Sequence, residues 1–219
     1  MERPVIDVFR GIGWRVARAL GLGGLVMWLH PRSALRTTGW LRTFESAQPM
    51  NRNGDPIPWF TYPAVDFLLR ADLSGLRVFE YGSGASTLFF ARKVGEILSV
   101  DHDDMWSRRV AKRISPPHQV ICRPRGDLYT REIEKHGKFD IVVIDGVDRA
   151  QCALVALKCL TPEGVMIWDD AARADFRESL PQLLATGYQP LFFVGMAPIS
   201  FLACETAVLY KRGHNCLGI

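Results

Sequence analysis

Residues 76–101, LRVFEYGSGASTLFFARKVGEILSVD, decide the fold class. The stretch opens with a short apolar run at 76–81, turns at two glycines and continues as a helical pattern over 85–94. A second apolar run at 96–101 ends in an acidic residue. Strand, tight turn, helix and strand in this order are typical of a βαβ unit, whose two strands lie parallel in one sheet.

The same alternation continues to the end of the chain. Further strands are predicted over 118–124, 138–145 and 164–170, and KFDIVVID at 138–145 is the clearest buried run. The remaining predicted elements are helices over 103–114, 131–137, 153–160 and 174–186, and two final strands over 188–195 and 205–212 with no helix between them. This pattern predicts an α/β protein with a Rossmann-like, doubly wound, seven-stranded sheet that is mostly parallel and has an antiparallel last strand.

Composition divides the chain into two parts. The 219 residues are 48% hydrophobic and 23% charged, which is typical of a folded globular protein. The proline- and glycine-rich loop at 46–58 separates a basic, apolar helical extension (1–56) from the main domain (57–219), whose first helix begins near Pro63. Residues 1–50 contain seven arginines and three acidic residues, which accounts for the whole net charge of +4. The main domain is therefore balanced in charge, and nucleic acid is not an expected partner.

The extension contains a helical pattern over 5–29 that includes the apolar run ALGLGGLVMWL at 19–29. Eleven residues are too few to span a bilayer, which takes ~20 in a helix. A helix packed on the domain is the favoured interpretation, followed by peripheral membrane contact through residues 5–29 and then by a secretion signal. The five cysteines contain no CxxC pattern and favour a reducing compartment, so the expected location is cytoplasmic, with membrane association as an addition.

Acidic residues follow every parallel strand of the predicted sheet. They are Glu80, Asp101, Asp127, Asp145 and the pair Asp169–Asp170. Because ligands of doubly wound sheets bind beyond the carboxyl ends of the strands, we expect these side chains to surround one site.

The glycine turn after the first strand indicates which ligand fits. Gly82 and Gly84 allow close approach of the backbone to a ligand, but Thr87 stands where a dinucleotide-binding pattern has its third glycine. Glu80 is unfavourable beside a pyrophosphate and suits a cationic amine or sulfonium. Asp101 follows Gly82 by 19 residues, the spacing at which a carboxylate holds ribose hydroxyls.

Taken together, these motifs over residues ~57–212 resemble class I S-adenosylmethionine (SAM)-dependent methyltransferases. GDPIPWFTYPAVDFL followed by VFEYGSG further resembles members from bacteria and plants. The resemblance implies SAM as cofactor, with the turn at the methionine part, Asp101 at the ribose, Asp127 at the adenine and Asp145 near the transferred methyl group. The cofactor-binding residues that it implies are Glu80, Tyr81, Gly82, Ser83, Gly84, Ser86, Thr87, Asp101, His102, Asp127 and Asp145.

A second resemblance concerns metal-dependent O-methyltransferases, which bind a divalent ion through acids after the fourth and fifth strands. Asp145, Asp169 and Asp170 match that arrangement. Three carboxylates suit Mg²⁺, which would lower the pKa of an acceptor hydroxyl.

The expected reaction is methyl transfer to an acceptor, with oxygen favoured over nitrogen. Asp145, Asp169 or His102 is the expected base. The acceptor is a small molecule or a sugar- or lipid-linked substrate, and the oligomeric state is left open. The aromatic residues Trp59, Phe60 and Tyr62 either form an acceptor wall or belong to the core.

Several interpretations stay open from the sequence. Arg149 either binds an anionic acceptor or lies on a solvated helix start, and Cys152 is expected to pack in the core. An NAD(P)-dependent oxidoreductase is one alternative function, although neither Tyr129 nor Tyr188 has a lysine four residues later. A non-catalytic, cofactor-binding or membrane-associated module is the other.

Overall fold

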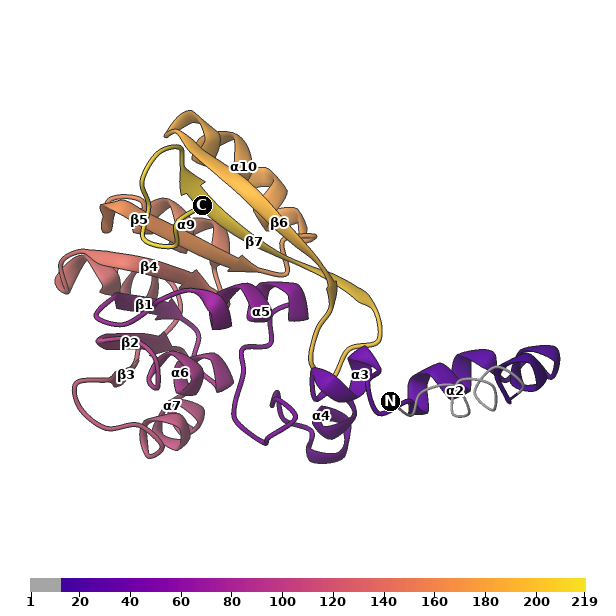
Figure 1. The fold of residues 1–219 in the computed structure, drawn as a ribbon. Helices are drawn as coiled ribbons and strands as arrows, with labels where there is room; N and C mark the ends of the chain where they lie inside the picture. The colour runs from indigo at the N-terminus through magenta and orange to yellow at the C-terminus, as the bar shows by residue number, and fades with distance from the viewer. Residues whose placement is uncertain (1–12) are drawn as a thin grey trace.

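A seven-stranded sheet forms the centre of the molecule (Figure 1). The computed structural model describes residues 13–219, apart from the side chains of residues 26, 27 and 29. The strands lie in the order β3-β2-β1-β4-β5-β7-β6; β1 to β5 pair in parallel, and β7 is antiparallel to both of its neighbours. The predicted α/β class with an antiparallel last strand is confirmed. The strands are β1 Arg77–Tyr81, β2 Glu96–Asp101, β3 Gln119–Cys122, β4 Phe139–Ile144, β5 Leu160–Asp169, β6 Tyr188–Met196 and β7 Ala203–Lys211.

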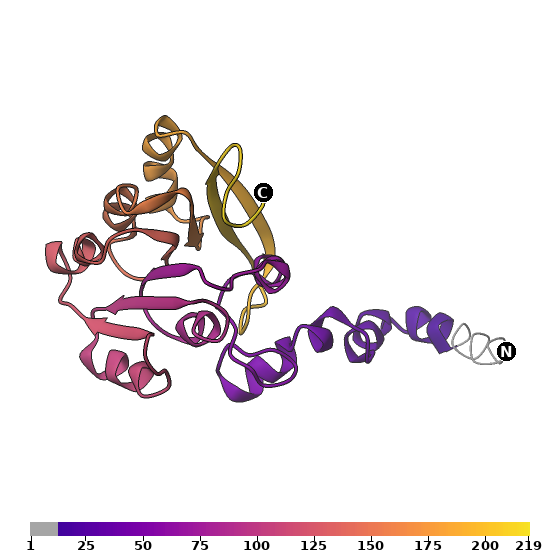
Figure 2. The same cartoon turned by 60° about the vertical axis from the view of Figure 1, so that its left-hand side comes forward.

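Helices cover both faces of the sheet, as Figure 2 shows from the side. Helices α5 and α6 pack on one face, and α8, η1, α9 and α10 pack on the other. Helix α7 lies beside β2 and β3. The bounds are α5 Tyr62–Arg70, α6 Ala85–Phe90, α7 Asp104–Ala111, α8 Asp127–Thr130, the 3₁₀ helix η1 Glu132–Lys135, α9 Arg149–Ala156 and α10 Ala174–Ala185.

The central strands are apolar throughout because both faces of the sheet are buried. In β4, Ile141 and Val143 join the core under α5 and α6, while Val142 and Ile144 join the core under α9 and α10. Each of these side chains is fully buried, and full burial of such a side chain stabilises a fold by about 1.5–3 kcal/mol. The sheet is therefore a rigid base for the loops at its carboxyl edge.

Several element boundaries differ from the sequence prediction. The helix predicted over 153–160 is α9 Arg149–Ala156, which begins four residues earlier. It ends before Leu160 because Leu160 already pairs with Phe139 in the sheet. The N-terminal helical pattern is interrupted: residues 13–19 and α2 Gly23–Leu29 are helical, and Gly21 between them has a φ of +71°. The part of the predicted helix over residues 5–12 lies outside the described residues.

The extension contacts the domain through short helices rather than through its apolar run. In α4 (Trp40–Ser46), the Trp40 indole N–H donates to the Ser200 carbonyl at 2.7 Å, and the Ile199 amide donates to the Thr43 hydroxyl at 3.0 Å. Helix α3 Ala34–Thr37 precedes it. Figures 1 and 2 show α2 extending away from the domain, so this part is not packed on the domain as the favoured interpretation expected. Within residues 13–219, no helix combines the length and apolar character that a membrane span needs.

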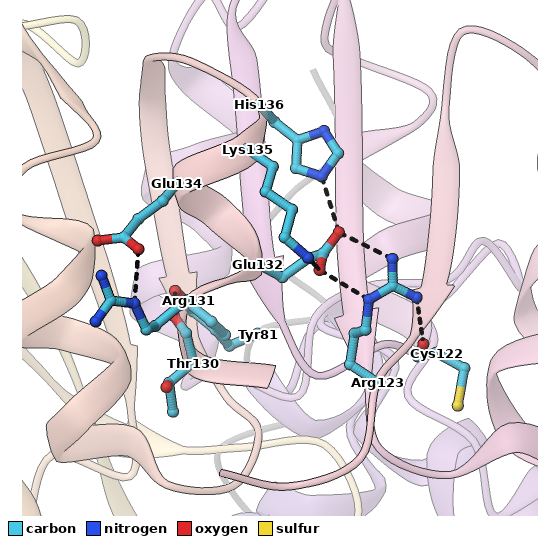
Figure 3. A network of polar contacts seen from close by, with 9 residues as sticks. All are labelled: Tyr81, Cys122, Arg123, Thr130, Arg131, Glu132, Glu134, Lys135 and His136. Atoms are coloured by element: carbon cyan, nitrogen blue, oxygen red, sulfur yellow. Dashed lines mark hydrogen bonds and ion pairs between the residues drawn. The ribbon is translucent and has the colours of Figure 1, made fainter. Parts of the chain in front are cut away.

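A buried carboxylate ties β3 to the segment that follows α8 (Figure 3). Glu132 is 1% exposed and accepts hydrogen bonds from Arg123 at 2.8 and 3.1 Å and from Lys135 at 2.7 Å. A nitrogen of His136 lies 3.1 Å from the same carboxylate. Burial alone raises the pKa of Glu132, but these bonds outweigh it and lower the pKa to about 2.

Replacing this carboxylate is expected to destabilise the fold in a pH-dependent way. For Glu132→Gln we expect a loss of about 2–3 kcal/mol in the free energy of unfolding at pH 7, measured by urea titration. Because the folded pKa is depressed, the contribution is complete above the unfolded pKa of 4.5 and disappears as pH falls towards 2. Glu134→Gln is the control, since Glu134 pairs with the exposed Arg131 and such pairs contribute less than about 1 kcal/mol. Equal losses in the two variants would contradict this account.

Candidate active site

The loops after β1 and β4 touch at the carboxyl edge of the sheet. Gly82 has a φ of +96°, and a Cβ on it would lie 3.1 Å from the Asp145 carbonyl oxygen. A Cβ on Gly146 would lie 2.8 Å from the Gly82 amide nitrogen and 2.0 Å from the Tyr129 hydroxyl oxygen. The contacts at Gly146 exclude a side chain, and the left-handed backbone at Gly82 strongly favours glycine there. The two loops therefore bring the residues after β1 and β4 into one site.

Glu80 lies beneath the first of these loops. Its Oε2 accepts hydrogen bonds from the Thr87 hydroxyl at 2.5 Å and the Ser99 hydroxyl at 2.6 Å, while Thr87 Oγ1 accepts from the Gly84 amide at 2.9 Å. The carboxyl is fully buried, which raises its pKa, and its Oε1 has no partner among the described residues. Glu80 thus supports the glycine turn from below.

Asp101 ends β2 and faces the site. Its side chain accepts hydrogen bonds from the Ser83 hydroxyl at 2.7 Å and from the Asp103 amide at 3.0 Å. His102 Nδ1 lies 3.5 Å from Asp101 Oδ1. The hydrogen bonds from Ser83 and Asp103 hold the Asp101 carboxylate on one side of the glycine turn.

Asp145 follows β4 and is held by Arg149 from the start of α9. An Arg149 nitrogen donates to Asp145 Oδ1 at 3.1 Å, and others donate to the carbonyls of Gly146 at 3.0 Å and Asp169 at 2.6 Å. The Arg149 side chain is only 9% exposed. This corrects the interpretation of Arg149 as a solvated residue, because its guanidinium is a buried link between the ends of β4 and β5.

Two carboxyls at this edge have raised pKa values. Burial and the charge of Asp169 raise the pKa of Asp145, and Arg149 offsets only part of that effect. Burial and the charge of Asp170 raise the pKa of Asp169 to about 7. Thr206 donates a hydrogen bond to Asp169 at 2.9 Å, inside the sheet edge. Raised carboxyl pKa values of this kind are typical of groups that exchange protons near neutral pH.

The predicted magnesium site does not fit these residues. Between Gly13 and Ile219, no three His, Cys, Asp or Glu side chains are grouped so that they could hold a metal ion. The Arg149 guanidinium lies among the proposed ligands, 3.1 Å from an Asp145 oxygen and 3.8 Å from an Asp170 oxygen. Asp169 instead accepts a hydrogen bond from Thr206. The Arg149 guanidinium therefore lies where Asp145, Asp169 and Asp170 were expected to share Mg²⁺.

Two hollows meet at these loops. One, of about 420 Å³, is lined by Gly82, Asp101, His102 and Gly146. The other, of about 350 Å³, lies against residues 47–59 and helices α6 and α7, and includes Gly84 and Ser86 in its wall. Three residues line both hollows: Ser83, Trp106 and Asp145. The Trp106 indole N–H donates to the Ser83 carbonyl at 2.7 Å.

Several predicted residues lie outside these hollows. Tyr81 is buried in the core, where its hydroxyl donates to the Thr130 carbonyl at 2.6 Å. Thr87 is buried beside Glu80, and Asp127 lines a separate hollow on α8. The structure therefore brings together Gly82, Ser83, Gly84, Ser86, Asp101, His102 and Asp145 but not Glu80, Tyr81, Thr87 or Asp127.

The aromatic residues after the proline-rich loop divide between the two roles that the sequence left open. Phe60 is fully buried in the core, whereas Trp59 is 49% exposed and lines the second hollow. Trp106 and Met50 also line that hollow and were missed from the sequence. The position of Trp106 on the first turn of a helix after an acidic strand end is the signal that could have identified it.

Sequence comparisons give no match, either to protein-family models or to curated proteins. Solved structures do match. An O-methyltransferase from Streptomyces achromogenes, solved with SAM, has a TM-score of 0.58 at 14% identity over 81% of this chain and 88% of its own. An O-methyltransferase from Bacillus cereus, solved with S-adenosylhomocysteine (SAH), has a TM-score of 0.56 at 15% identity over 88% and 97%. A precorrin-6y C5,15-methyltransferase from Geobacter metallireducens has a TM-score of 0.53 at 16% identity over 68% and 87%. The chain shares the Rossmann-like fold of these methyltransferases.

Proposed function

We propose that this chain is a SAM-dependent methyltransferase that acts on an oxygen of a small molecule or of a sugar- or lipid-linked acceptor. The observation that carries the proposal is the junction of two hollows at Asp145, one beside Asp101 and the glycine turn and one beside residues 47–59. A methyl donor in the first and an acceptor in the second would meet at a carboxyl whose pKa is raised. The shared fold of known methyltransferases supports the same function.

The residues around the first hollow fit SAM. Gly82 lines this hollow, and the Asp101 carboxylate, held by Ser83, can accept hydrogen bonds from ribose hydroxyls. When bound, SAM supplies an electrophilic methyl group on its sulfonium centre. Asp145 would take the proton of the acceptor hydroxyl, so that its oxygen could accept the methyl group that SAM supplies. Arg149 holds the Asp145 carboxylate in place throughout.

Calorimetric titration with SAH tests the proposal. We expect micromolar binding of SAH and none of NAD. Asp101→Ala removes the two acceptor oxygens for the ribose and is expected to weaken SAH binding by at least about tenfold. His214→Ala is the control, because His214 is exposed and lies outside both hollows. Unchanged SAH affinity in Asp101→Ala would contradict the ribose assignment.

The same titration addresses the alternative functions. Binding of NAD instead of SAH would favour an oxidoreductase, and the side chain of Thr87 beneath the turn weighs against it. Binding of neither compound would favour a non-catalytic module. A cytoplasmic location is part of the present proposal, and the five free cysteines are consistent with a reducing compartment.

We also propose peripheral membrane contact through the N-terminal helices. Six large apolar side chains there are at least 40% exposed: Trp14, Val16, Leu20, Leu22, Leu25 and Trp28. Arg15 and Arg18 are exposed in the first of these helices, residues 13–19. Apolar side chains combined with arginines favour an anionic lipid surface.

Co-sedimentation with vesicles measures this contact. Vesicles containing phosphatidylglycerol are expected to retain the wild type at least about tenfold better than pure phosphatidylcholine vesicles. The double substitution Leu25→Asp and Trp28→Asp is expected to abolish retention. Leu69→Asp, on an exposed position of α5, is the control and is expected to have no effect. Retention that is independent of lipid charge would contradict the proposed contact.

A further inference from the structure

The hollow beside residues 47–59 has an aromatic lining that the methyl transfer itself does not require. Trp59 is 49% exposed and Trp106 is 42% exposed, and both line this hollow. Indole rings that remain open to solvent in a concave site gain buried area when a planar ring packs on them. The lining therefore favours an aromatic ligand over a flexible aliphatic one.

Two arginines of α7 and its following turn line the same hollow. Arg109 lies in α7 and Arg113 in the turn that follows it, and both line the hollow. Neither has a carboxylate within 4 Å across the described range 13–219, whereas the adjacent Arg108 pairs with Asp104 at 2.9 Å. The Arg109 guanidinium lies 5.8 Å from the centre of the Trp106 ring. Unpaired guanidinium groups next to an aromatic wall are suited to an anionic group on a planar ligand.

The charge at the two sides of the hollow sets the orientation of such a ligand. Asp145 lines the hollow from the carboxyl edge of the sheet, where a negative group on the ligand would be repelled. Helix α7 starts at that edge and runs back along the sheet, so Arg113 lies further from the edge than Arg109. An anion at the arginines leaves the opposite part of the ligand to face Asp145.

We propose that the acceptor is an aromatic hydroxyl compound that carries an anionic group such as a carboxylate or a sulfonate. The ring packs against Trp59 and Trp106, the anion pairs with Arg109 and Arg113, and the hydroxyl faces Asp145. This assignment rests on the proposed methyltransferase function, since that function places the reacting oxygen at Asp145.

Calorimetric titration of the SAH-saturated protein tests the assignment with four probes. They are 4-hydroxybenzoate, 4-hydroxybenzenesulfonate, phenol and cyclohexanecarboxylate. We expect 4-hydroxybenzoate, 4-hydroxybenzenesulfonate or both to bind at least about tenfold tighter than phenol and than cyclohexanecarboxylate. The comparison of the two anionic phenols distinguishes a planar from a tetrahedral anion.

The double variant R109Q/R113Q is expected to lose the preference for the anionic phenols, to within about twofold of phenol. R108Q is the matched control, because Arg108 lies on the same helix but outside the hollow, and it is expected to keep the preference. The proposal would be overturned if phenol or cyclohexanecarboxylate bound as tightly as the anionic phenols, or if neither anionic phenol bound. It would also be overturned if the preference for the anionic phenols survived in the double variant.

Two further readouts separate this assignment from the proposed function. SAH affinity is expected to be the same in R109Q/R113Q and the wild type; a parallel loss would assign the arginines to the cofactor's carboxylate and overturn the proposal. If SAH fails to bind the wild type, the methyltransferase proposal fails, and titration of 4-hydroxybenzoate and phenol into the unliganded protein still measures whether the hollow selects anionic phenols.

Discussion

Asp145→Asn is expected to lower kcat for methyl transfer by about 10²- to 10⁴-fold, the range that a positioned general base contributes. Asp145 is the acidic residue that lines both hollows, and Arg149 fixes its carboxylate. Asparagine keeps the shape and the contact with Arg149 but cannot take a proton. SAH affinity is therefore expected to change little, which separates loss of chemistry from loss of binding.

The pH profile gives an independent check on Asp145. A base acts only when it is unprotonated, and burial together with Asp169 raises the pKa of Asp145. The rate is therefore expected to rise with pH as Asp145 loses its proton, and Asp145→Asn removes this limb of the profile. Asp66→Asn is the control and is expected to keep this limb, since Asp66 is exposed, pairs with Arg70 at 2.9 Å and lines neither hollow. A rate for Asp145→Asn within tenfold of the wild-type rate would contradict the role of Asp145 as the base. The role would then pass to His102, which lines the first hollow, rather than to Asp169, which lines neither hollow.

Gly146→Ala is expected to cost about 1–3 kcal/mol of stability, as overpacking of a filled site does. The added Cβ would lie 2.0 Å from the Tyr129 hydroxyl oxygen and 2.8 Å from the Gly82 amide nitrogen. One loop must then move away from the other. Because Gly82 and Asp145 are in these loops, SAH binding is expected to weaken by more than about tenfold along with stability.

A second substitution can show how much of this loss of stability comes from each of the two contacts. Tyr129→Phe removes the hydroxyl that the Cβ meets, so the combination with Gly146→Ala is expected to recover part of the stability. Recovery is incomplete, because the contact with the Gly82 amide remains. Gly24→Ala in α2 is the control: nothing lies within 4 Å of a Cβ there, and alanine favours a helix. Urea unfolding of the variants measures all of these effects, and additive losses in the double variant would contradict the proposed clash.

The sequence predicted the sheet because burial on both faces forces near-continuous apolar strands, as in β4. It also predicted which edge carries the site, since parallel strands all end at that edge. It did not predict where each side chain points. Glu80 and Asp101 both end strands, but Glu80 points under the turn to Ser99 and Thr87, whereas Asp101 faces the first hollow. Asp127 begins α8 directly after Gly126, whose φ is +92°, and lines neither hollow.

Long side chains were the hardest to place from the sequence. Arg149 was assigned either to an anionic ligand or to solvent, and the carboxylates around it were assigned to a metal. Its guanidinium spans the distance between two strand ends, which depends on the register of β4 and β5 and on the first residue of α9. Neither of these can be read from a local pattern. The same holds for Arg109 and Arg113. Their spacing of four residues is visible in the sequence, but the sequence does not show that residues 47–59 line the same hollow.

The loop after α4, a helix that Trp40 bonds to Ser200, limits how far the chain can be shortened. Residues 47–56 follow α4 directly and supply one wall of the second hollow, including Met50 and Pro56. A fragment that starts at residue 57 would contain every strand of the sheet and Asp145, yet its acceptor side would be open to water. If the chain is the methyltransferase proposed above, limited proteolysis within the loop at 46–58 should reduce discrimination among acceptors more than it reduces SAH affinity.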